Sequence, residues 1–137
     1  GVTGHALAIG AILLCCADVR IGADGPYKIG LNEVAIGMPV PGCAVSLCQE
    51  RLAIPAFTAA IQLAKIHTPQ EALAAGFLDR IVDAAAVRGD AIATAAELGE
   101  RLHRGPFRTT RATVRGHVAE ALRRNLAEDL GAFDVSA

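Results

Sequence analysis

The sequence lacks an excess of charge of either sign, because its 137 residues carry 13 Lys and Arg against 14 Asp and Glu. This balance gives no indication of a nucleic acid or an anionic membrane as a partner. The one basic cluster, residues 104–124, falls on an expected helix and is interpreted as its solvated or subunit-facing side. Aromatic residues are also scarce, at 4%, so a core has to be built from aliphatic residues and alanine.

Long hydrophobic runs are missing as well, although 53% of the residues are hydrophobic. The longest apolar stretch, residues 6–17, is shorter than the roughly 20 residues that span a bilayer. The opening residues, GVTGH, lack the positive charge of a signal peptide. The high apolar content therefore predicts a helix-rich chain, or one with surface to bury against a partner, and no membrane association.

The four cysteines do not form a recognisable framework, since none of them stands in a C-x-x-C pair. They are Cys15, Cys16, Cys43 and Cys48. Two of them are adjacent inside an apolar run, where free cysteine behaves as a small hydrophobic residue. Such usage is typical of cytosolic proteins with free thiols, and we expect a cytoplasmic location.

Several catalytic signatures are absent. No two of the four histidines have the i, i+4 spacing of a metal site, so we expect no metal. Neither Ser46 nor Ser136, the only serines, lies in a G-x-S-x-G elbow. The sequence has no P-loop and no G-x-G-x-x-G motif. Nucleophilic and nucleotide-dependent chemistry therefore have no support.

Short strands followed by helices make up the expected organisation, which places the chain in the α/β or α+β class. Strands are expected over residues 1–4, 18–23, 27–31 and 78–83, and helices over 41–52, 54–64, 68–77 and from about 88 to the end. Residues 6–16 are apolar on every face and predict a buried helix over about residues 8–16, although a strand remains possible.

Two of the expected helices carry informative patterns. Thr68, Pro69 and Glu71 form a capping box with proline at the first helical position, and Gly76 is the expected C-cap. In the C-terminal region an apolar stripe recurs about every four residues: Val114, Val118, Leu122, Leu126, Leu130 and Phe133. We expect this stripe to be an exposed strip that docks on a core or on a second subunit.

Glu33 is the one carboxylate in the otherwise apolar run of residues 29–42. It is either a surface residue at a turn or a carboxylate placed among apolar groups for a task. Apolar surroundings disfavour the ionised form of a carboxyl group. A carboxylate so placed can take and return protons near neutral pH. No second carboxylate lies within eight residues, so any acid–base chemistry here depends on one group or on a distant partner.

Small residues precede the apolar run, in the stretch GHALAIGAI of residues 4–12. The first N–H groups of a helix have no internal partner and can bind an anion or a developing oxyanion. Small residues before a buried helix also serve packing alone. Both interpretations stay open on these residues.

Taken together, residues 2–42 and 68–83 resemble the crotonase superfamily, which includes enoyl-CoA hydratases and isomerases. The shared features are a G-[HYN]-A turn, a glycine-containing apolar helix ending in Asp, and a strand. A glutamate followed by an apolar-x-Gly and a proline comes next, and then a segment like "EAL..GLVD.VV". The resemblance implies an α/β fold, a spiral of β-β-α units, and an acyl-CoA thioester as substrate with no further cofactor.

The resemblance also implies roles for single residues. Glu33 matches a catalytic glutamate, and the backbone N–H of Ile9 matches one donor of an oxyanion hole, where the family usually has glycine. Gly10, Ile12 and Asn32 are implied as substrate-binding residues. Hydratases of the family have a second glutamate where this chain has Ile12. A single base suits the shift of a double bond from the 3- to the 2-position, so the isomerase branch is favoured over the hydratase.

The resemblance covers only the later part of the family's sequence, so the N-terminal part of the fold is expected to be missing. Residues 1–87 match the C-terminal part of the core, and residues 88–137 match the helical tail that the family uses for trimer contacts. We expect a homo-oligomer, a trimer or a dimer of trimers, acting in fatty acid metabolism. A non-catalytic module that acts only within an assembly is the alternative.

Overall fold

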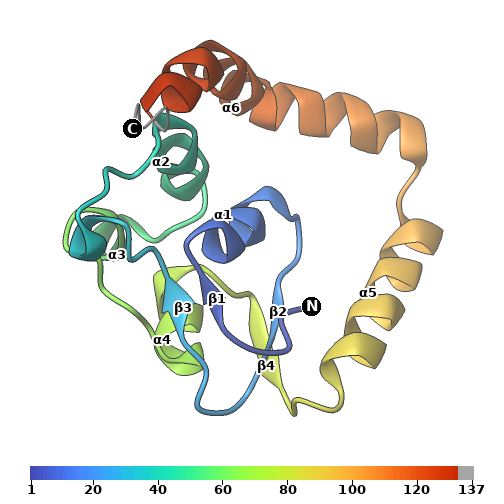
Figure 1. Cartoon of the computed structure of the whole chain (residues 1–137). Coiled ribbons are helices and arrows are strands. Elements are labelled where there is room, and N and C mark those ends of the chain that lie inside the picture. Colours follow the sequence, from blue (N-terminus) through green and yellow to red (C-terminus); the bar gives the residue numbers. More distant parts are fainter. Residues whose placement is uncertain (133–137) are drawn as a thin grey trace.

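The computed structural model describes residues 1–132, which form a mixed α/β structure (Figure 1). In chain order the elements are β1 (Ala6–Leu7), α1 (Ile9–Cys16), β2 (Ile21–Ala23), β3 (Ile29–Gly30), a 3-10 turn η1 (Val34–Ile36), α2 (Gly42–Gln49), α3 (Ile54–Ile61), α4 (Pro69–Ala75), β4 (Arg80–Val82), α5 (Val87–Arg101) and α6 (Arg104–Ala132).

The strands form two small parallel pairs at the centre of the molecule. β1 pairs with β3, with Ala6 opposite Ile29 and Leu7 opposite Gly30. β2 pairs with β4, and each pair is joined through a helix-containing crossover, as parallel strands require. Figure 1 shows α1 lying across these strands, with α2, α3 and α4 on one side.

Three of the four expected strands are present but shorter, and one expected strand is not formed. Residues 1–4 contribute only a single bridge, from Val2 to Gly22, rather than a strand. Residues 6 and 7, in front of the helix expected over about residues 8–16, form β1, a strand that was not expected. Parallel pairing explains this strand, because the N–H of Ala6 donates to the Lys28 carbonyl at 2.9 Å. The first helix therefore begins only at Ile9.

Apolar side chains from every layer meet in one core cluster, with Phe77, Leu31 and Ala11 completely buried. α1 contributes one face to this cluster, through Ala11, Ile12 and Cys15. Its opposite face is open, since Ile9 is 65% exposed and Leu13 is 61% exposed. The expectation of a helix buried all round was therefore wrong: within the described residues, α1 is covered on one face only.

The capping signals of α4 are confirmed in full. The Thr68 hydroxyl accepts from the Glu71 N–H, and the Glu71 side chain accepts from the Thr68 N–H. Pro69 opens the helix, and Gly76 ends it with φ of +91°, in the left-handed region. Buried Arg20 closes the same corner, because its guanidinium donates to both carboxylate oxygens of Asp79 and to the Gly76 carbonyl.

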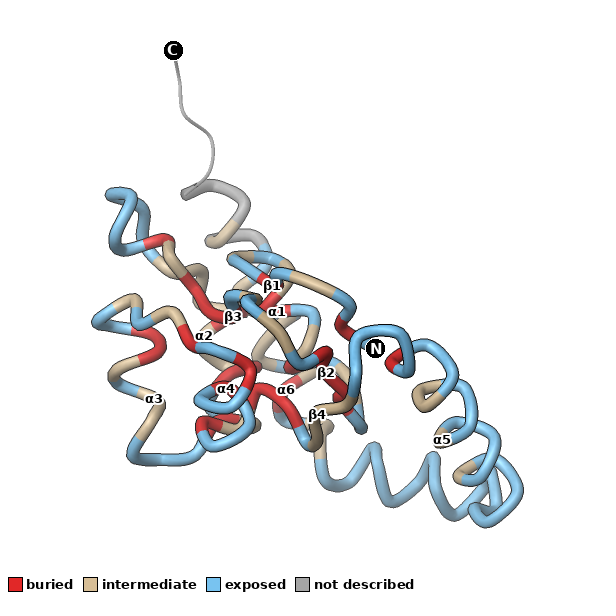
Figure 2. The backbone as a smooth tube through the Cα atoms, turned by 90° about the horizontal axis from the view of Figure 1, so that it is seen from below, coloured by how far each residue is buried: buried red, intermediate tan, exposed pale blue. Residues whose placement is uncertain are grey.

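The two C-terminal helices form an arm that runs round the molecule and returns to α2 (Figure 1). Figure 2 shows α5 and the start of α6 largely exposed. Asp129 fastens the far end, because its carboxylate accepts the N–H groups of Gly42 and Cys43 at 2.7 and 2.8 Å. Burial works against the charge of Asp129, yet these donors outweigh it and hold its pKa below the usual range.

The apolar stripe on this arm is not the continuous exposed strip that we expected. Val118 is buried in the core cluster and Leu122 packs against it, because α6 lies on α2. Val114 and Leu126 are exposed as expected, at 59% and 53%. Phe133 lies outside the described residues. The middle of the stripe, Val118 and Leu122, therefore packs into the core of this chain.

We predict that Gly76→Ala lowers the free energy of unfolding by at least about 2 kcal/mol, since a side chain disfavours positive φ. A Cβ there would also lie 2.6 Å from the Arg51 carbonyl oxygen. Gly116→Ala is the control, because a Cβ at that helical position meets nothing within 4 Å. It should raise stability by roughly 0.5–1 kcal/mol. Urea denaturation measures both, and equal effects would contradict the account of Gly76.

Candidate active site

The β1–β3 pair brings the start of α1 and the segment with Glu33 to the same edge. Leu7 lies opposite Gly30, and the N–H of Ala8 donates to the Gly30 carbonyl at 3.0 Å. Because the strands are parallel, both chains leave the pair at the same end. α1 begins two residues after Leu7, and Glu33 follows Gly30 by three residues.

The turn into α1 leaves two N–H groups available. Ala8 has φ of 50° and ψ of −120°, a conformation that is uncommon for residues other than glycine and is often found at functional sites. Its carbonyl accepts from the N–H groups of Ala11 and Ile12, at 2.9 and 3.1 Å. The hydrogen bonds among the described residues include none from the N–H of Ile9 or Gly10. The expected helix and its free first donors are thus confirmed.

Glu33 lies at a turn but is buried, so it is not the surface residue of the first interpretation, and a functional role stays a prediction. Its carbonyl accepts from the Ile36 and Met38 N–H groups, which closes the turn of η1. The residue is only 6% exposed. Its Oε2 atom is buried without a hydrogen-bond partner among the described residues. Buried polar atoms are nearly always paired, and Arg51 Nε is the other side-chain atom in the described part of the chain that is buried without a partner.

The apolar residues around Glu33 are arranged less uniformly than the sequence suggests. Ile29 and Leu31, before it, are buried at 1% and 0% exposure. Val34 and Ile36, after it, are exposed at 46% and 61%. Glu33 therefore lies at the boundary between the core and an open apolar surface. Such a position suits a group that has to meet an apolar ligand from one side.

Ile12 and Asn32 occupy different surroundings. Ile12 is 7% exposed and belongs to the core, so this position offers no second carboxylate. Asn32 is half-buried and borders a cavity of about 410 Å³ next to Leu7. The other residues around it are Tyr27, Lys28, Ile66, His67 and Thr68. As far as the described residues show, Ile9, Gly10, Ile12 and Glu33 do not line this cavity.

Histidine His67 forms part of that cavity wall and is held by its surroundings. It is 3% exposed, packs against the Phe77 ring and lies 3.3 Å from the Ile29 carbonyl through Nδ1. Burial lowers the pKa of His67, so the ring is neutral near pH 7. His5, nearer to the turn into α1, accepts the Lys28 N–H through Nδ1. Both contacts give these histidines structural roles.

Sequence reasoning missed the groups that hold the other end of α1. Arg115 of α6 donates to the Cys15 and Cys16 carbonyls at 2.9 and 3.1 Å. Arg51 donates to the Ala17 carbonyl at 2.6 Å. These cations face the negative end of the helix dipole. α1 is therefore fixed at its C-terminus, while its N-terminal donors stay free.

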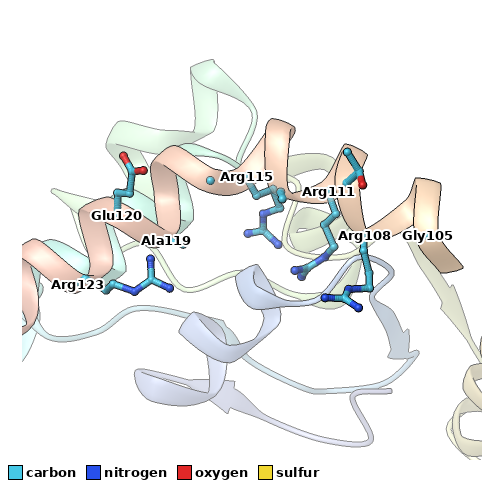
Figure 3. A pocket seen from close by; sticks show the side chains of 10 residues that line it. Gly105, Arg108, Arg111, Arg115, Ala119, Glu120 and Arg123 are labelled. Atoms are coloured by element: carbon cyan, nitrogen blue, oxygen red, sulfur yellow. The ribbon is translucent and has the colours of Figure 1, made fainter.

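The basic cluster is consequently more than a solvated helix face. Figure 3 shows Arg108, Arg111, Arg115 and Arg123 pointing from α6 toward α1, beside a cavity of about 740 Å³. Arg111 pairs with Asp18 at 3.1 Å, and the Arg115 side chain is only 12% exposed. The signal was available in the sequence, since arginines at positions 108, 111 and 115 share one face of a helix.

Two further features of the described residues bear on the class of site. Within residues 1–132, no group of three His, Cys, Asp or Glu side chains is arranged to hold a metal ion. No helix in the described part of the chain is long and apolar enough to cross a membrane.

Comparison with known proteins gives consistent matches. The family model described as enoyl-CoA hydratase/isomerase matches residues 1–135. The mitochondrial enoyl-CoA delta isomerase 1 of Mus musculus is 34% identical over 82 residues, which are 59% of this chain and 28% of that protein. The chain thus spans less than a third of that relative.

Solved structures extend this likeness to the fold. An enoyl-CoA hydratase/isomerase family protein from Pseudomonas syringae has a TM-score of 0.88 and 40% identity, over 92% of this chain and 54% of that chain. The human mitochondrial delta3-delta2-enoyl-CoA isomerase has a TM-score of 0.85 and 29% identity, over 93% of this chain and 50% of that chain. The predicted crotonase-like α/β fold is confirmed, and the chain spans about half of each structure.

We predict that Glu33→Met raises the free energy of unfolding by about 1 kcal/mol or more. Methionine has a similar length and removes an unpartnered buried oxygen, which is costly to the fold. Asp79→Asn is the matched control, since this carboxylate is paired with buried Arg20, and its loss should lower stability. Urea denaturation at neutral pH compares them. A loss of stability in Glu33→Met would mean that Glu33 serves the fold.

Proposed function

The chain belongs to the enoyl-CoA hydratase/isomerase family, within the crotonase superfamily, and we propose that it shifts the double bond of an enoyl-CoA from the 3- to the 2-position. The observation that carries this proposal is the buried, unpartnered carboxylate oxygen of Glu33 in a site where position 12 is an apolar isoleucine. One carboxylate is sufficient for moving a proton between two carbons of one substrate.

In the proposed reaction Glu33 acts as base and then as acid. It removes a proton from C2 of a 3-enoyl thioester, and the electron pair moves through the thioester carbonyl to form an enolate. The N–H of Ile9, at the positive end of α1, would hold the enolate oxygen. When the enolate collapses, C4 takes the proton back from Glu33, and the double bond lies between C2 and C3. Atoms and charge balance without a cofactor.

The hydratase is the closer alternative. Adding water to a 2-enoyl thioester requires one group to activate the water and help to protonate C2, and two carboxylates suit that task. Buried Ile12 provides no such group, which supports the isomerase. The relatives from mouse and human with isomerase in their names lend further support.

The second alternative is a non-catalytic module. It is supported by the finding that this chain covers only 54% and 50% of the two solved structures. Under our proposal the site works in an assembly, and Gly10, Ile12 and Asn32 contact the acyl-CoA beside Ile9 and Glu33. Exposed Val114 and Leu126, on the arm, are proposed to join subunits in a homo-oligomer, a trimer or a dimer of trimers.

The metabolic process and the cellular location of the reaction are likewise proposals. A 3-enoyl-CoA arises when unsaturated fatty acyl chains are shortened, so we assign the chain to fatty acid metabolism. We keep the cytoplasm as its expected location, although the mouse relative is named as mitochondrial.

We expect Glu33→Gln to lower the rate of 3-enoyl-CoA isomerisation by about 10²–10⁴-fold, because glutamine keeps the shape but cannot accept the proton. The assay is run on the 137 residues and on the longest polypeptide that contains them. Glu97→Gln is the control, since this exposed residue of α5 lies outside the proposed site and should leave the rate unchanged.

The outcomes separate the alternatives. Undiminished activity of Glu33→Gln would end the proposed mechanism. Hydration of a 2-enoyl-CoA as fast as isomerisation would favour the hydratase. Inactivity toward both substrates in every assembly tested, together with acyl-CoA binding that Glu33→Gln leaves unchanged, would favour the non-catalytic module.

A further inference from the structure

Two buried thiols meet where α1 packs against α2. The Sγ atoms of Cys15 and Cys48 are 3.7 Å apart, and both residues have 0% exposure. The four cysteines of the chain are free thiols in this structure. We propose that Cys15 and Cys48 form a reversible disulfide when the protein meets a peroxide. The inference is independent of the proposed reaction, which uses neither sulfur.

The surroundings of the two sulfurs differentiate their roles. The hydrogen bond with Cys48 lowers the pKa of Cys15 most, and the charges of Arg20, Arg51 and Arg115 lower it further, against the effect of burial. The same hydrogen bond raises the pKa of Cys48, and burial and nearby negative charge, including that of Glu33, add to this. Arg115 donates to the Cys15 carbonyl, so a positive charge lies beside this residue. Since the thiolate is the nucleophile, the proposal assigns the first attack to Cys15 and the second to Cys48.

The chemistry balances with peroxide as the oxidant. The Cys15 thiolate attacks one peroxide oxygen, the O–O bond breaks, and a sulfenic acid and hydroxide form; the hydroxide takes a proton to become water. The Cys48 sulfur then attacks the Cys15 sulfur, so the S–S bond forms and the S–O bond breaks. The departing hydroxide takes the Cys48 proton. Two thiols are oxidised, and one peroxide is reduced to two waters.

The bond would change the part of the chain that holds the candidate site. The two cysteines are 33 positions apart, and Glu33, β2 and β3 lie between them. A disulfide closing this loop restricts the unfolded chain and should raise Tm by about 10 °C. It would also join α1, which presents the Ile9 N–H, covalently to α2. Oxidation would thus stiffen the site.

Double variants of the whole chain provide the test, because they separate the pair from the other two thiols. Cys16→Ala/Cys43→Ala keeps only the proposed pair, and Cys15→Ala/Cys48→Ala keeps only exposed Cys16 and half-buried Cys43. Each protein is reduced, treated with hydrogen peroxide, unfolded and alkylated with iodoacetamide. Intact mass then counts the thiols that remain, and Tm is measured before and after dithiothreitol.

We expect Cys16→Ala/Cys43→Ala to lose two hydrogens, to resist alkylation and to show the higher Tm until dithiothreitol reverses it. Cys15→Ala/Cys48→Ala should form no bond within the chain. Full alkylation of Cys16→Ala/Cys43→Ala after peroxide treatment, under conditions that oxidise Cys16 in the unmodified chain, would overturn the proposal. So would a disulfide formed only between chains. Cys16→Ala/Cys43→Ala retains both buried sulfurs and the core around them, so a folding defect would not explain the absence of a disulfide in this variant.

Discussion

The candidate site depends on the parallel pairing of β1 and β3, and above all on the hydrogen bond from the Ala8 N–H to the Gly30 carbonyl. This bond holds the last turn before α1 against the strand that leads to Glu33. Because the Ala8 N–H already has this partner, the next two N–H groups, those of Ile9 and Gly10, are the first free donors of the helix. A helix start and a carboxylate from distant parts of the sequence are thereby placed at one edge.

α1 then acts as a rigid link between this edge and the rest of the chain. Its inner face lies in the core through Ala11 and Cys15, and Arg51 and Arg115 bind the carbonyls at its C-terminus. Arg115 belongs to α6, which is itself fastened to α2 through Asp129. The C-terminal arm therefore contributes to the site indirectly, by fixing the helix whose opposite end presents the donors. Among the described residues, two side-chain atoms, Glu33 Oε2 and Arg51 Nε, are buried without a hydrogen-bond partner. The proposed reaction would give the Glu33 oxygen a role that the fold does not provide.

Local signals made some of this predictable. The capping box of Thr68 and Glu71 and the C-cap at Gly76 depend on neighbouring residues alone, so the sequence was sufficient for α4. The resemblance supplied Glu33 and Ile9 as the candidate site residues, and their roles stay a prediction. The strand β1 was missed because two residues carry no periodicity, and only its partner β3 makes it a strand. The exposed face of α1 and the buried centre of the α6 stripe depend on which surfaces meet, which composition does not encode. The role of Arg115 depends on a contact across 100 positions.

Under the proposed function, the free N–H groups of Ile9 and Gly10 and the Glu33 carboxylate face the same thioester. An NMR titration of the ¹⁵N-labelled chain with an acyl-CoA that cannot isomerise, such as a saturated one, tests it most directly. We expect the Ile9 and Gly10 amide signals to shift in proportion to occupancy, together with those of residues 32 and 33. Saturable binding that leaves these amides unchanged, with shifts confined to other elements, would contradict it.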